Sequence, residues 1–229
     1  MKTPRDMPPP PQVILFDLGG VLIELAGVAR MLEMTGNRWS VEELWRLWLH
    51  SPVVRAYETG SIDTAEFGRE VVREFGIDIS PEQYLAEFTL WARAPYDGAH
   101  DLLRSLATRC RLAALSNTND IHWQRIEREM GLLEMFERCF ASHLTGMLKP
   151  DAGAYRNVCD SMGVAADRVV FVDDNDINVA GARAVGMAAY RVQGFTQARA
   201  LFRRLGLLGT AEQGRTGVPV AAQEGRAGS

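Results

Sequence analysis

Three short apolar runs in this chain are each followed at once by polar residues, and this recurrence constrains the fold more than any other feature. The pairs are 13–16 before Asp17, 112–115 before Ser116 and Asn117, and 169–172 before Asp173 and Asp174. About four apolar residues without alternation are typical of a parallel strand that is covered on both faces. Ligands of open α/β sheets bind just beyond the carboxyl ends of the strands. The sequence therefore predicts one parallel sheet with a polar site at that edge.

A lysine arrives at the same place from a loop. Lys149 and Pro150 stand just ahead of a helical segment that Asp151 could cap. A solvated surface position is the usual one for lysine, but here several acidic groups are expected at the neighbouring strand ends. We therefore expect Lys149 to reach the polar site.

Helical and strand patterns alternate from residue 97 onward. We expect helices at 97–108, 119–130, 151–162, 177–185 and 196–206, and strands at 112–116, 138–142, 169–173 and 188–192. This alternation predicts a doubly wound parallel sheet with helices on both faces.

Residues 24–93 contain no convincing buried strand but several helix starts. Ser40-Val41-Glu42-Glu43 and Ser80-Pro81-Glu82-Gln83 have the capping-box pattern. A small helical bundle inserted after the first strand is the simplest interpretation. Its candidates for contact with a substrate are the aromatic residues Trp45, Trp48, Tyr57 and Trp91, although the i, i+3 spacing of Trp45 and Trp48 is more often that of a bundle core.

We divide the chain into four parts on these patterns. They are a flexible proline-rich leader (1–11), an α/β catalytic core (12–22 and 94–206), a helical cap (23–93) and a flexible tail (207–229). A cap above the strand ends could exclude water and select the substrate.

Composition excludes several classes of protein. The 25 basic and 29 acidic residues give a net charge of −4 without a basic stripe, so nucleic acid is not an expected partner. No apolar run approaches the ~20 residues of a membrane span, and the N-terminus lacks the apolar core of a signal peptide. Three cysteines without a paired motif fit a reducing compartment. We expect a cytoplasmic protein, either a monomer or a homodimer, that does not interact with membranes.

The chain resembles the haloacid dehalogenase (HAD) superfamily in four segments. They are FDLGGVL (16–22), LSNTN (115–119), GMLKPDAGAY (146–155) and FVDDNDINVAGARAVGM (171–187). Within that superfamily they are most similar to alpha-glucose-1-phosphate phosphatases and to the phosphatase domain of soluble epoxide hydrolases. The resemblance implies a HAD-type Rossmann-like fold with a helical cap, and the turn 58–62 resembles the one by which such caps face the active site.

The resemblance also implies a Mg²⁺-dependent phosphatase for a small phosphorylated metabolite such as a sugar phosphate. Asp17 would be the nucleophile, assisted by Ser116 and Lys149. The implied phosphate ligands are Ser116, Asn117 and Lys149, and the implied Mg²⁺ ligands are Asp17, the carbonyl of Gly19, Asp173 and Asp174. Asn117 could equally close the turn, and Asn178 could position Asp174 or start a helix.

One position departs from the family pattern. Most of these phosphatases have a second Asp two residues after the nucleophile, which protonates the leaving group, but this chain has Gly19 there. Three readings follow: a slow phosphatase whose proton comes from solvent, from a substrate hydroxyl or from a nearby residue; a 2-haloacid dehalogenase with the same Asp nucleophile; or a silent protein that binds a phosphorylated ligand.

The adjacent Asp173 and Asp174 favour the phosphatase. Neighbouring carboxylates repel one another, and a divalent cation would keep them ionised, whereas the dehalogenases of the superfamily need no metal. His122 and His143 are expected near the catalytic edge. A structural role is more usual for such histidines than replacement of the missing acid.

Overall fold

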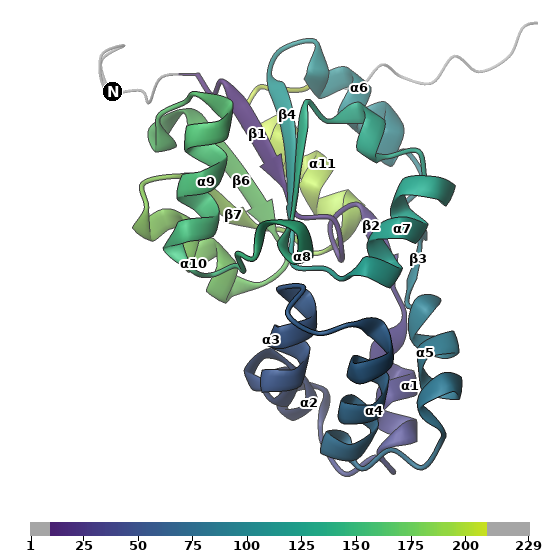
Figure 1. Ribbon diagram of the computed structural model, residues 1–229. Helices are drawn as coiled ribbons and strands as arrows, with labels where there is room; N and C mark the ends of the chain where they lie inside the picture. The colour runs from purple at the N-terminus through teal and green to yellow at the C-terminus, as the bar shows by residue number, and fades with distance from the viewer. Residues whose placement is uncertain (1–9, 210–229) are drawn as a thin grey trace, which may run out of the picture.

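The computed structural model describes residues 10–209, so the leader and tail expected at the two ends lie largely outside the described residues. Its core is a five-stranded parallel sheet in the order β5-β4-β1-β6-β7 (Figure 1). The strands are β1 (Val13–Phe16), β4 (Arg111–Ser116), β5 (Arg138–Ala141), β6 (Val169–Asp173) and β7 (Ala188–Arg191). The predicted parallel sheet is therefore confirmed.

Helices cover both faces of this sheet, as the alternating pattern predicted (Figure 1). They are α6 (Ala99–Ala107), α7 (Asp120–Glu129), α9 (Ala152–Met162), α10 (Asp176–Ala184) and α11 (Gly194–Arg204). The short helix α8 (Ser142–Thr145) directly follows β5 at the carboxyl end of the sheet. Two 3₁₀ turns, Leu133–Met135 and Ala166–Arg168, lie in the connections.

Alternate residues of β1 enter two different apolar layers. Ile14 and Phe16 pack with the side chains of α6, α7 and α11, whereas Val13 and Leu15 pack with those of α9 and α10. All four side chains are completely buried. Burial on both faces explains why the strand is a continuous apolar run rather than an alternating one.

The segment after β1 forms a second, helical part of the molecule below the sheet in Figure 1. It consists of α1 (Gly27–Met34), α2 (Val41–His50), α3 (Pro52–Glu58), α4 (Thr64–Phe75) and α5 (Pro81–Thr89) around their own apolar cluster. We call these helices the cap. Both predicted capping boxes are present, at Ser40 with Glu43 and at Ser80 with Gln83.

Two short antiparallel strands connect the cap to the core and were not predicted. They are β2 (Ile23–Leu25) and β3 (Ala92–Pro95). Each has a single buried residue. Strands that are so short and so exposed leave no apolar pattern in the sequence.

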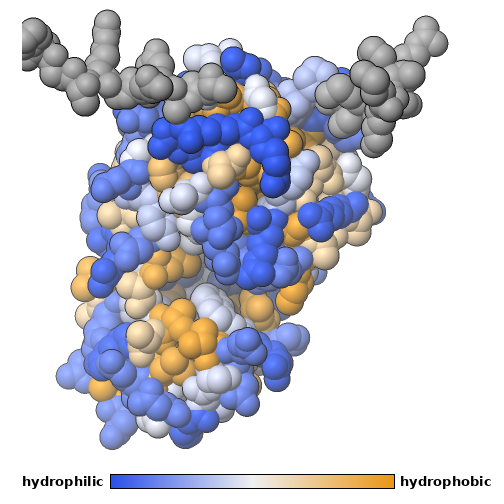
Figure 2. Space-filling model, turned by 180° about the vertical axis from the view of Figure 1, so that it is seen from behind, coloured by the Kyte–Doolittle hydropathy of each residue, from blue (hydrophilic) through white to orange (hydrophobic). Residues whose placement is uncertain are grey.

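The cap aromatics divide between its core and its surface. Tyr57 stacks on Phe67 with ring centroids 4.1 Å apart, and its hydroxyl is hydrogen-bonded to Thr64. Trp48 packs among other aromatic rings, whereas Trp45 is 41% exposed. Tyr57 and Trp48 are therefore part of the cap core. Seen from behind, the cap end of the molecule carries an apolar patch bordered by hydrophilic residues (Figure 2).

Among the described residues, no helix combines the length and the apolar character needed to cross a membrane.

Candidate active site

Three neighbouring strands deliver polar side chains to one edge of the sheet. Asp17 follows β1, Ser116 ends β4 and Asp173 ends β6. Because β1 pairs with both β4 and β6, these three residues are brought side by side. All three are buried. The loop after α8 adds Lys149, as predicted from the sequence.

The ammonium group of Lys149 lies between two carboxylates. Its Nζ is 2.8 Å from Oδ1 of Asp17 and 2.6 Å from Oδ2 of Asp173. Burial opposes the charge on Lys149, but the two carboxylates outweigh it and raise its pKa. Lys149 is therefore cationic at neutral pH and compensates part of the negative charge of the site.

Asn117 fixes the backbone of Lys149. Its side-chain oxygen accepts from the N–H of Lys149, and its amide group donates to the carbonyl of Lys149, both at 2.9 Å. These two hydrogen bonds position the backbone of Lys149, and one hydrogen of the Asn117 amide group remains for a ligand.

Both carboxylate oxygens of Asp173 accept hydrogen bonds. Its Oδ1 accepts from the backbone N–H of Asn175 at 2.8 Å, and the amide of Asn178 donates to both carboxylate oxygens at 3.0 and 3.1 Å. Asn178 thus orients Asp173, whereas the sequence suggested Asp174 as its partner. Asp173 is therefore oriented by these hydrogen bonds and in turn positions the ammonium group of Lys149.

The carboxylates of Asp17, Asp173 and Asp174 each place an oxygen within 4.8 Å of the others. Burial is the main cause that raises the pKa of Asp17 to about 8, with Lys149 opposing it and the other two carboxylates adding to it. Burial and the charge of Asp173 raise the pKa of Asp174 to about 6. Without a bound cation, the carboxylates of this cluster are therefore not all ionised at neutral pH.

Such a cluster of carboxylate oxygens matches the ligands that Mg²⁺ prefers. A divalent cation would neutralise the charges that Lys149 leaves uncompensated. The residues present therefore fit a divalent metal site.

The space beside Gly19 is apolar. A Cβ atom at position 19 would lie 3.0 Å from Cδ1 of Leu25. The φ angle of Gly19 is not positive, so the backbone at this position does not require glycine. The side chain of Leu25 thus borders the position at which the family's second Asp would start.

The two histidines considered from the sequence are poorly suited to replace that acid. His122 Nε2 donates to the carbonyl of Phe88 at 2.6 Å, and burial lowers the pKa of His122 to about 4. Burial also lowers the pKa of His143. Both are uncharged at neutral pH, and His122 is tied to the cap.

Glu58 belongs near the site and was not selected as a functional residue from the sequence. It is the last residue of α3 and comes close enough to Lys149 for that ammonium to influence its pKa. The segment 58–62, which resembled the turn by which family caps face the active site, begins with this residue. That resemblance was the available signal.

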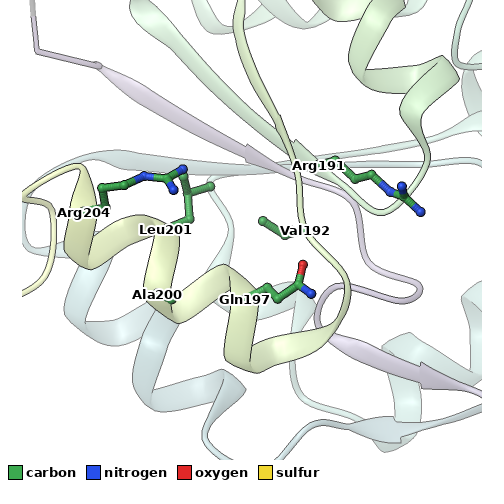
Figure 3. A pocket seen from close by; sticks show the side chains of 6 residues that line it. All are labelled: Arg191, Val192, Gln197, Ala200, Leu201 and Arg204. Carbon is green, nitrogen blue, oxygen red and sulfur yellow. The ribbon is translucent and has the colours of Figure 1, made fainter.

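A separate cavity of about 240 Å³ lies between β7 and α11 (Figure 3). Arg191 and Arg204 supply its charged side chains, but Figure 3 shows their guanidinium groups at opposite ends. Arg191 is bound to the carbonyl of Asp174 and to the carboxylate of Asp176. The cavity therefore does not form one anion site.

The model of the haloacid dehalogenase-like hydrolase family matches residues 11–186, and the chain belongs to this family. It is 29% identical over 178 residues to the sesquiterpene phosphatase astK of Aspergillus oryzae, with 76% of this chain and 85% of that protein covered. It is 28% identical over 204 residues to an (S)-2-haloacid dehalogenase of Xanthobacter autotrophicus, with 85% and 79% covered.

Solved structures agree with this assignment. A HAD family enzyme of Bacteroides thetaiotaomicron, in complex with magnesium and inorganic phosphate, is 27% identical and superposes with a TM-score of 0.66. The match covers 80% of this chain and 94% of that enzyme. The chain is thus a HAD-like hydrolase, and its relatives include both phosphatases and dehalogenases.

Proposed function

We propose that this protein is a Mg²⁺-dependent phosphomonoester hydrolase that acts on a small phosphorylated metabolite, such as a sugar phosphate, in the cytoplasm. The observation that carries the proposal is the cluster of the Asp17, Asp173 and Asp174 carboxylates, whose oxygens lie within 4.8 Å of one another. Lys149 compensates part of the negative charge of this cluster. Displacement of halide from a neutral carbon would not need a third carboxylate beside the nucleophile.

Asp17, Asp174 and the carbonyl of Gly19 are the proposed Mg²⁺ ligands, with Asp173 binding directly or through water. When bound, Mg²⁺ would neutralise phosphoryl oxygens and keep Asp17 ionised. The magnesium and phosphate bound to the B. thetaiotaomicron enzyme support a magnesium site in a protein of this fold.

The carboxylate of Asp17 attacks phosphorus in line, and the bond from phosphorus to the ester oxygen breaks. Ser116 and the side-chain amide of Asn117 hold the phosphoryl oxygens, whereas the backbone N–H of Thr118 already donates to Oγ of Ser142. Lys149 stabilises the charge that develops on them. Water then hydrolyses the aspartyl phosphate, which releases phosphate and restores Asp17.

A 2-haloacid dehalogenase is the second candidate function. Asp17 would then form a carbon ester by displacing halide. Two observations favour it: position 19 carries no acid, and the neighbouring Leu25 side chain is apolar. The similarity to the Xanthobacter dehalogenase points the same way.

One assay separates these functions. The protein is incubated with p-nitrophenyl phosphate and a panel of sugar phosphates in the presence of Mg²⁺, and with 2-chloropropionate in the presence of a chelator. We expect phosphate release that requires Mg²⁺ and no chloride release. Metal-independent chloride release would establish the dehalogenase, and no turnover in either arm would indicate a silent binding protein.

A further inference from the structure

The leaving group of a phosphate ester needs a proton, and the family's usual donor is missing from the core. Position 19 has no side chain, and Leu25 occupies the space next to it. Asp17, Asp173 and Asp174 are committed to the nucleophile and the proposed metal. The cap, whose helix α3 contacts α8, can bring another donor to the ester oxygen.

Helix α3 of the cap lies against the core near Lys149. The guanidinium of Arg55 is 2.7 Å from the carboxylate of Asp151, two residues after Lys149. Gly60 lies so close to α8 that a Cβ atom there would be 2.5 Å from the carbonyl oxygen of His143. Figure 1 shows the end of α3 directly below α8. These two contacts place the turn after α3 next to the loop that carries Lys149.

Glu58 stands between these contacts, at the last position of α3. Burial raises the pKa of Glu58 to about 7, and the charges of Lys149 and Arg55 and the indole of Trp48 work against this rise. A carboxyl group with such a pKa is both a competent acid and a competent base at neutral pH. The charged groups that face it are Lys149 from the core and Arg55 from its own helix.

We propose that Glu58 of the cap is the general acid and base of the reaction, in place of the acid that Gly19 lacks. This proposal rests on the phosphatase function proposed above. In the first step the protonated Glu58 gives its proton to the ester oxygen as the bond from that oxygen to phosphorus breaks. In the second step ionised Glu58 takes a proton from the water that attacks the aspartyl phosphate. Glu58 is then protonated again, and alcohol and inorganic phosphate are the products.

The test uses Glu58→Gln, which keeps the shape of the side chain but cannot exchange a proton in this way. Glu66→Gln is the matched control, because Glu66 is an exposed glutamate of the same cap. Both are compared with the unmodified protein on p-nitrophenyl phosphate and on an alkyl phosphate, with Mg²⁺ present. Rapid-quench kinetics measure the phosphorylation and dephosphorylation of Asp17 separately.

For the aryl ester, whose leaving group needs little protonation, Glu58→Gln should release about one equivalent of nitrophenol rapidly and then turn over about 10²-fold more slowly, while phosphoenzyme accumulates. For the alkyl ester, phosphorylation itself should fall by about 10²-fold or more. In the unmodified protein, that alkyl phosphorylation rate should decline as the pH rises above about 7, because Glu58 loses its proton. Glu58→Gln should lack this decline, and Glu66→Gln should behave like the unmodified protein.

Equal losses on both esters without phosphoenzyme accumulation would show that Glu58 only shapes the site and would overturn the proposal. Unchanged kinetics would overturn it too, while leaving the phosphatase function intact. A Glu58→Asp variant, which retains a carboxyl group, should recover part of the activity if Glu58→Gln folds poorly; no recovery in a folded Glu58→Asp protein would count against the role. An unmodified protein without phosphatase activity would overturn the proposed function and this proposal together.

Discussion

Gly20 and Asp174 approach each other so closely that a side chain at position 20 has no room. A Cβ atom on Gly20 would lie 2.3 Å from Oδ2 of Asp174, and Gly20 has a φ of +69°. Glycine is therefore required here for two reasons, the left-handed backbone and the contact with an expected metal ligand. The second glycine after Asp17 shapes the carboxylate cluster.

Replacing Gly20 with alanine should displace the Asp174 carboxylate. We expect Gly20→Ala to raise the Mg²⁺ concentration needed for half-maximal activity by about tenfold or more, since a 1.4 kcal/mol loss already gives that factor. Gly163→Ala is the control, because Gly163 has a similar φ of +63° but no neighbour within 4 Å. A Mg²⁺ titration of activity and of melting temperature measures both. Equal effects of the two substitutions would show that backbone strain alone weakens Mg²⁺ binding.

The stabilisation by Mg²⁺ should depend on pH. The pKa values of Asp17 and Asp174 are raised, so the folded state holds these protons more tightly than the unfolded chain. In a chelator, their contribution to stability is therefore complete below about pH 4 and is lost as the pH rises toward 8. Mg²⁺ competes with the same protons. The difference in melting temperature between Mg²⁺ and chelator should increase from pH 6 to pH 8.

Asp174→Asn is the control for this pH series and should flatten it. Ca²⁺ should also raise the melting temperature but should support turnover poorly, because its longer bonds misplace the phosphoryl group. A Mg²⁺ effect that decreases toward pH 8 would contradict the assignment of these carboxylates as metal ligands.

The buried Lys149 should contribute to stability through its two carboxylate partners. Removing one member of a buried ion pair typically costs about 3–5 kcal/mol, so Lys149→Met should lower the free energy of unfolding by that order. Adding Asp173→Asn should restore much of the loss without restoring turnover. Arg104→Met removes the exposed ion pair with Asp101 and should cost less than about 1 kcal/mol. Urea unfolding measures all four proteins, and a Lys149→Met protein as stable as the unmodified one would refute this account.

The sequence predicted the sheet and the strand-end residues because both depend on local patterns. A buried parallel strand is a continuous apolar run, and its carboxyl end is where the next polar residue stands. Asp17, Ser116 and Asp173 could therefore be placed together before the structure was known. The site roles proposed for them remain predictions.

The contacts between distant segments could not be predicted in this way. The two hydrogen bonds from Asn117 to Lys149 join residues 32 positions apart, and the amide of Asn178 selects Asp173 rather than its neighbour Asp174. Glu58 begins the segment 58–62 that resembles a family cap turn, but this resemblance does not single out its side chain. Its environment depends on how the cap packs against α8, which the sequence pattern does not encode.

The central claim is that Asp17 is phosphorylated, and rapid-quench mass spectrometry tests it most directly. The protein is mixed with p-nitrophenyl phosphate and Mg²⁺, quenched in acid within milliseconds and digested with protease. The account predicts one phosphoryl group on the peptide that contains Asp17, none in chelator, and none in a folded Asp17→Asn protein that is free of deamidation. Turnover of the ester without any phosphoryl group on Asp17, or full activity of Asp17→Asn, would contradict it.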